Sequence, residues 1–149
     1  MSKIILPKSL SQFAFLFKGA KYWLAGMLVL GAVGMWFGAT AKINDDWLWL
    51  AWIATVSVIL VAATPLTDNN WIGLHVSAAV LACMSVTALA VVCCPWSIAV
   101  WVGYVAYTLA TDCYYKKLVA ELCCIVEALA VTYDFTTNYS DKIINWFVS

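Results

Sequence analysis

The chain has 149 residues and no net charge, and 65% of its residues are hydrophobic while only 11% are charged. So little polar sequence cannot cover a water-soluble domain of this size, and the few charges give no support to nucleic-acid binding. The hydrophobic residues gather in stretches of about 20 residues, the length that crosses a bilayer core of roughly 30 Å. We therefore predict an all-α integral membrane protein, a bundle of about five transmembrane helices with an N-terminal interfacial amphipathic helix.

Residues 1–21 form the first predicted element, which is basic and amphipathic. Its four lysines and its large apolar side chains, without any acid, are typical of a helix that lies on an anionic leaflet. We expect this helix to anchor the topology. The alternative is that it recognises a lipid or a partner protein.

Five hydrophobic segments follow, and each is predicted to cross the membrane. They are residues 22–41, 47–64, 71–94, 96–111 and 118–133. The connections are short, so neighbouring helices should run antiparallel. The fifth segment contains Glu121 and Glu127, which are costly inside a bilayer, so it is alternatively a tilted or partly interfacial helix. Residues 134–149 are predicted to be a short extracytoplasmic tail, with a second interfacial helix as the alternative.

The orientation is predicted from the lysines alone, because the chain contains no arginine. With five spans, most lysines fall on one side of the membrane. That group is Lys3, Lys8, Lys18, Lys21, Lys116 and Lys117. Only Lys42 and Lys142 lie on the opposite side. The positive-inside rule then places the N-terminus in the cytoplasm and the C-terminus outside.

Small residues on two spans predict close helix packing. Gly31, Gly34 and Gly38 recur three and four residues apart, so they share one face of the first span. Ala78 and Ala82 do the same on the third span. Helix association brings no hydrophobic gain among lipid tails. Close van der Waals contact between small residues must therefore drive the association. The contacts are expected within one subunit or between the subunits of a homo-oligomer.

A stripe of hydroxyl groups and amphipathic rings runs along one face of the fourth span. Its members, three or four residues apart, are Ser97, Trp101, Tyr104, Thr108, Thr111 and Tyr115. Hydrogen bonding to other helices or to the helix's own backbone explains such a stripe. The functional alternative is the lining of a water-filled or ligand-filled cavity. A solvent-accessible stripe would favour transport, and a dry, packed stripe would favour a scaffold.

Four ionisable residues are candidates for ion or proton binding, because ionisable groups inside a membrane are costly. In the predicted orientation His75, Asp112 and Glu121 lie at similar depth near the cytoplasmic side, where folding can join them into one cluster. The alternative is that each is satisfied separately, for example by a pair between Glu121 and Lys117. Glu127 lies deeper, and we expect its carboxyl to be neutral and to donate a hydrogen bond, because burial penalises the charged form.

Motifs for catalysis are missing from the sequence. It has one histidine and neither a nucleophile elbow nor a glycine-rich phosphate loop. Its six cysteines include two adjacent pairs and have no metal-ligand spacing, so they are assigned to packing. We therefore predict no catalytic residues, no metal, no cofactor and no enzymatic activity.

These observations leave two main functional hypotheses. The first is an oligomeric pore, channel or carrier for an ion or small solute, formed in the membrane lipids by copies of this chain. The second is a non-catalytic scaffold or regulatory module that binds a partner protein or lipid through its small-residue faces and basic N-terminal helix. A third, weaker hypothesis is a membrane-perturbing effector such as a holin.

Overall fold

The computed structural model describes residues 9–10, 12, 19–64, 69–111 and 115–148, with the backbone alone for residues 69–70 and 134–148. The described elements are helices, with no strand among them, which confirms the predicted helical class. In chain order they are α2 (Ala20–Thr40), η1 (Asp45–Trp47), α3 (Leu48–Ala63), α4 (Asn69–Cys93), η2 (Pro95–Ser97), α5 (Ile98–Ala110) and α6 (Lys116–Val148). Most of the predicted N-terminal interfacial helix lies outside the described residues.

Three of the described helical segments are long and apolar enough to cross a membrane. They are Ala20–Thr40, Asp45–Ala63 and Trp71–Cys93, which match the first three predicted spans to within a few residues. These segments indicate a membrane location. The helix in the fourth predicted span, α5, has only 13 residues. The first half of α6 contains two lysines and two glutamates, which lower its hydropathy.

The last helix is longer than the sequence pattern predicts. We placed the end of the fifth span at residue 133, where the hydropathy falls, but α6 continues to Val148 and has 33 residues. Falling hydropathy does not end a helix by itself, because the backbone hydrogen bonds continue until a residue breaks them. Neither glycine nor proline occurs within α6. The fifth predicted span and the predicted tail therefore belong to one helix.

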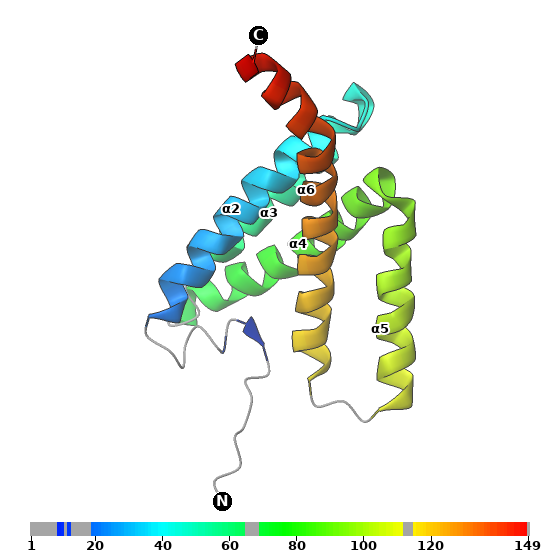
Figure 1. Ribbon diagram of the computed structural model, residues 1–149. Helices are drawn as coiled ribbons and strands as arrows, with labels where there is room; N and C mark the ends of the chain where they lie inside the picture. Colours follow the sequence, from blue (N-terminus) through cyan, green and yellow to red (C-terminus); the bar gives the residue numbers. More distant parts are fainter. Residues whose placement is uncertain (1–8, 11, 13–18, 65–68, 112–114, 149) are drawn as a thin grey trace, which may run out of the picture.

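Successive helices alternate in direction along the bundle (Figure 1). At one end Lys42, which follows α2, places its Nζ 3.8 Å from Sγ of Cys94, which follows α4. At the other end the backbone N–H of Leu10 donates to Oε2 of Glu121, near the start of α6, at 2.7 Å. Each contact joins two parts of the chain that the predicted antiparallel order places at the same end of the bundle.

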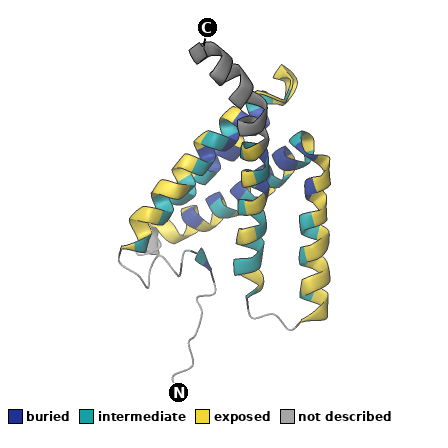
Figure 2. Ribbon diagram, in the orientation of Figure 1, coloured by how far each residue is buried: buried dark blue, intermediate teal, exposed yellow. Residues whose placement is uncertain are grey.

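The hydrophobic core lies where α2, α3, α4 and α6 meet. Met35, Leu89 and Val131 are fully buried there among alanines of α2, α3 and α4. The alanines let the helix backbones approach, and the larger side chains fill the remaining space. Helix α5 stands at the edge of this core and has no buried residue (Figure 2).

The small residues predicted to pack differ in their surroundings within the chain. A Cβ atom added to Gly34 would lie 2.9 Å from Cγ2 of Thr132, so α2 and α6 approach closely because Gly34 has no side chain. The other buried members of the predicted set are Gly38, Ala78 and Ala82. A Cβ on Gly31 would meet nothing within 4 Å. Two crossing helices touch over a limited length, so a shared face does not bring every residue into contact.

Candidate functional site

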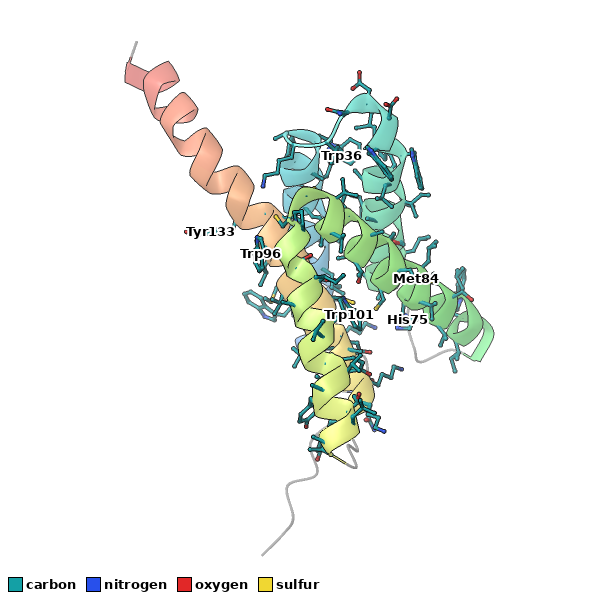
Figure 3. All side chains as sticks on the ribbon, turned by 90° about the vertical axis from the view of Figure 1, so that its right-hand side faces the viewer. Trp36, His75, Met84, Trp96, Trp101 and Tyr133 are labelled. Atoms are coloured by element: carbon teal, nitrogen blue, oxygen red, sulfur yellow. The ribbon has the colours of Figure 1, made fainter. Side chains whose placement is uncertain are left out.

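A buried carboxyl group occupies the junction of α4, α5 and α6. The side chain of Glu127 on α6 is 0% exposed. Trp101 of α5 donates its indole N–H to Oε1 at 2.8 Å, and Thr87 of α4 donates its hydroxyl to Oε2 at 2.8 Å. In Figure 3, Trp101 lies where α5 passes in front of α6. Each carboxyl oxygen therefore has a neutral donor from a different helix.

One of these two hydrogen bonds has a fixed direction. An indole N–H can only donate, so Oε1 accepts whether or not the carboxyl is protonated. A protonated Oε2 can instead donate to the Thr87 hydroxyl, because a hydroxyl both donates and accepts. The expected donor role of Glu127 therefore stays a prediction.

The first half of the polar stripe, in η2 and α5, packs mainly against α6. Ser97, the last residue of η2 directly before α5, is fully buried. The rings of Trp101 and Tyr104 meet edge to face with centroids 5.4 Å apart. The Tyr104 hydroxyl donates to the carbonyl of Lys116, at the start of α6, at 3.3 Å. This half of the stripe therefore contributes to helix packing within the chain.

The second half of the stripe bonds mainly within its own helix. Thr108 donates to the carbonyl of Val105 at 2.9 Å, and Thr111 donates to the carbonyl of Tyr107 at 2.7 Å. Tyr115 lies beyond α5, half-buried just before α6. These contacts match the backbone-bonding explanation of the stripe, and the cavity lining that we also considered stays a prediction.

His75 joins the start of α4 to the end of α3. Its ring is buried, and Nδ1 lies 2.9 Å from the carbonyl oxygen and 3.1 Å from Oγ1 of Thr64. Bonding to the carbonyl requires the proton on Nδ1, because a carbonyl oxygen can only accept. The Thr64 hydroxyl in turn donates to the carbonyl of Leu60 at 2.6 Å. His75 thus connects two neighbouring helices.

Glu121 is half-buried near the start of α6 and binds the N-terminal segment. Its Oε2 accepts the N–H of Leu10, while Oγ of Ser9 accepts the N–H of Gln12 at 3.1 Å in the manner of a helix cap. Lys117, one helical turn before Glu121, and His75 of α4 lie around this carboxyl group. The cluster of His75, Asp112 and Glu121 stays a prediction, and Asp112 lies outside the described residues.

Two further polar contacts had not been expected from the sequence. The thiols of Cys83 on α4 and Cys124 on α6 lie near each other. The hydroxyls of Ser57 on α3 and Ser85 on α4 lie 3.3 Å apart in a buried position. Both contacts depend on which helix faces meet, and the only signal in the sequence was a polar residue inside an apolar span.

No protein-family model, curated protein or solved structure matches this chain. What the protein does must therefore be inferred from its own residues. The group with the clearest chemistry is Glu127, because a carboxyl buried among neutral donors can exist with or without a proton. The other ionisable candidates, His75 and Glu121, lie toward the end of the bundle where α6 begins.

Proposed function

We propose that the protein is a small membrane carrier that binds a proton at Glu127, inside a five-span bundle completed by α5 and α6. The observation that carries this proposal is the complete burial of that carboxyl with hydrogen bonds from Trp101 and Thr87, which are both neutral. A buried ionised carboxylate is costly unless it is neutralised. Binding a proton removes that cost, so protonation and packing at this junction are energetically linked.

The position of Glu127 along its helix supports this proposal. It lies 11 residues after Lys116, which corresponds to about 16 Å along an α-helix. If Lys116 marks the membrane surface, the carboxyl lies near the centre of a bilayer core of roughly 30 Å. Together η2 and α5 are about 25 Å long, a mismatch that local thinning of the bilayer can accommodate. The proposed orientation keeps α6 starting on the cytoplasmic side.

The packing of α5 favours a carrier over an open pore. Trp101 and Tyr104 each donate a hydrogen bond to a residue of α6, and the side chain of Glu127 is fully buried. Such a site is occluded, as a carrier site is between its two open states. A homo-oligomer formed through the exposed outer face of α5 remains part of the proposal.

Proton flux in proteoliposomes tests this proposal. Vesicles that contain a trapped pH dye and a potassium gradient receive valinomycin, and the internal pH is followed for wild type and Glu127→Gln. We expect wild type to move protons. The rate for Glu127→Gln should be at least tenfold lower than the wild-type rate. The Glu127→Asp variant should retain part of the rate because it retains a titratable carboxyl.

A matched control separates a role of Glu127 from a general effect of losing an acid. Asp45 lies exposed in η1, so Asp45→Asn should leave the flux unchanged. Equal rates in wild type and Glu127→Gln, with both proteins folded, would refute the proton carrier.

The second candidate is a scaffold, and the packing of Trp101 and Tyr104 against α6 favours it. In that case Glu127 is a structural hydrogen-bond acceptor, and partner or lipid binding involves the N-terminal segment that contacts Glu121 through Leu10. Folded wild-type protein that moves neither protons nor other ions would support this candidate over the carrier.

A further inference from the structure

Each oxygen of the buried Glu127 carboxyl has a neutral hydrogen-bonding partner from another helix. The indole nitrogen of Trp101 lies 2.8 Å from Oε1, and the hydroxyl oxygen of Thr87 lies 2.8 Å from Oε2. The side chain of Glu127 is fully buried, so bulk water does not compete for these positions. The chemistry of the two partners therefore determines which ion this carboxyl can hold.

The two partners differ in what they offer to an incoming ion. The indole of Trp101 can only donate, so Oε1 always faces a positively polarised hydrogen. The hydroxyl of Thr87 both donates and accepts, so it can reorient and accept a hydrogen bond from a protonated Oε2. A proton needs one lone pair on one oxygen atom, and Oε2 supplies it.

A metal cation has a greater need for oxygen ligands than a proton has. Hard cations such as Ca²⁺ take about 6–8 oxygen ligands, and K⁺ in a channel filter exchanges its water shell for carbonyl oxygens. Trp101 places a hydrogen atom where such a cation would need an oxygen atom. A cation that loses its water without a full replacement is a costly buried charge. The Trp101 side of the carboxyl therefore disfavours metal cations.

The ring of Trp101 is held in place by contacts on α5 and α6. It meets the ring of Tyr104 edge to face, with centroids 5.4 Å apart and 78° between the ring planes. The Tyr104 hydroxyl donates to the carbonyl of Lys116, at the start of α6, at 3.3 Å. Trp101 itself lies where α5 passes in front of α6 (Figure 3). These contacts orient the indole N–H toward Oε1 before an ion binds, which lowers the cost of ordering it.

We propose that Trp101 makes the Glu127 site selective for protons over metal cations such as Na⁺. This selectivity rests on the proposed proton-binding role of Glu127, to which it adds a specificity-determining residue. An O–H bond forms at Oε2 when the proton binds, and the Thr87 hydroxyl changes from donor to acceptor. The same O–H bond breaks when the proton leaves, and Thr87 donates again. Trp101 donates to Oε1 in both states.

A purely structural role of Trp101 predicts a different response to sodium. If the indole only fills space and satisfies a lone pair, its replacement changes the stability of the protein or its proton flux. The effect of Na⁺ on that flux then stays as in wild type. Competition between Na⁺ and the proton therefore distinguishes selectivity from packing.

The test measures proton flux in proteoliposomes with sodium chloride and with the same concentration of choline chloride. We expect Na⁺ to change the wild-type flux by less than twofold. Trp101→Ser replaces the N–H with an oxygen atom and leaves room for a cation, so Na⁺ should lower its proton flux at least fivefold. Uptake of radioactive sodium is a second readout. It should exceed that of empty vesicles for Trp101→Ser and not for wild type.

The matched control makes the same substitution at a nearby tryptophan. Trp96 belongs to η2 and is 64% exposed, so Trp96→Ser should respond to Na⁺ as wild type does. Circular dichroism and gel filtration establish that each variant is folded. If Trp101→Ser does not fold, Trp101→Phe decides instead, because it keeps an aromatic ring and removes the N–H. Its proton flux should be at least twofold more sensitive to Na⁺ than that of wild type, and equal sensitivity would overturn the proposal.

The outcomes separate the selectivity from the carrier itself. If Glu127→Gln abolishes proton flux while Na⁺ affects wild type and Trp101→Ser alike, the role of Trp101 is overturned and that of Glu127 stands. Sodium uptake by wild type that Glu127→Gln abolishes would also overturn the selectivity. If wild type moves no protons, the proposed function fails and the selectivity fails with it.

Discussion

The two halves of this bundle are built on different principles. Where α2, α3 and α4 meet, the buried residues are mostly alanines and aliphatic side chains, and the polar contacts there, a pair of serine hydroxyls and the bonds of His75 to Thr64, involve no carboxyl group. Where α4, α5 and α6 meet, a glutamate is fully buried and bonded from two helices. The first region gains stability from close contact, whereas the second accepts the cost of a buried carboxyl. We infer that the second region holds the function.

The largest effect on stability should come from the apolar region. Leu89→Ala removes a fully buried side chain from the core and should lower the free energy of unfolding by about 2–5 kcal/mol. Flux per folded molecule should stay the same, because the substitution leaves Glu127 and its donors in place. Denaturant unfolding in detergent together with flux at equal folded density measures both quantities. A selective loss of flux would contradict the division between the two regions.

Overfilling the closest helix contact should have the next largest effect. Gly34→Val places a side chain where even a Cβ would lie 2.9 Å from Thr132, which should cost about 1–3 kcal/mol. The substitution Gly31→Val is the matched control, because that position has open space within the chain. Thr132→Ala should restore part of the lost stability. Equal destabilisation at both glycines would show that the close contact at Gly34 is not what matters.

A substitution at the polar junction should affect activity more than stability. Trp101→Phe keeps an aromatic ring but removes the N–H that bonds Oε1 of Glu127, at a cost of about 1–3 kcal/mol for an unsatisfied buried group. Proton flux should change together with its pH dependence, because a donor to the carboxyl affects how readily it releases a proton. A pH profile of flux identical to that of wild type would show that Trp101 has no part in proton transport.

The smallest effect is expected at the serine pair. Ser57→Ala removes one side of a 3.3 Å contact between α3 and α4, and such bonds between membrane helices are worth about 0.6 kcal/mol on average. Each serine also contacts a carbonyl of its own helix, which lessens the loss. A double-mutant cycle with Ser85→Ala measures the coupling. A coupling above about 2 kcal/mol would contradict the view that this region gains its stability mainly from close apolar contact.

Hydropathy was enough to predict the helical class and the first three long helices. The predicted segment 22–41 corresponds to α2 at Ala20–Thr40, because apolar runs of this length end at polar connections. The extent of α6 was not predictable in this way, since its backbone continues past the last strongly apolar residues. Gly31 shows a related limit, because helical periodicity gives the face of a residue but not where two helices cross.

The sequence indicates single candidate residues more readily than the partners that they contact. Glu127 was a candidate because a carboxyl in an apolar run is costly, and that reasoning needs no knowledge of its neighbours. Trp101 was noticed for a different reason, as part of the α5 stripe, and its bond to Glu127 depends on how α5 packs on α6. Thr87 and the cysteine pair were missed, because their contacts arise between helices far apart in the sequence.

The most direct test of the central claim is whether Glu127 exchanges a proton with the surrounding water in the folded, membrane-inserted protein. Infrared difference spectra recorded across a pH change, for wild type and Glu127→Gln, report the C=O stretch of a protonated carboxyl. Our account predicts a band that appears as the pH falls, shifts in deuterated water and is missing from the variant. A wild-type spectrum without such a band would mean that Glu127 is sealed off from solvent protons and serves packing alone.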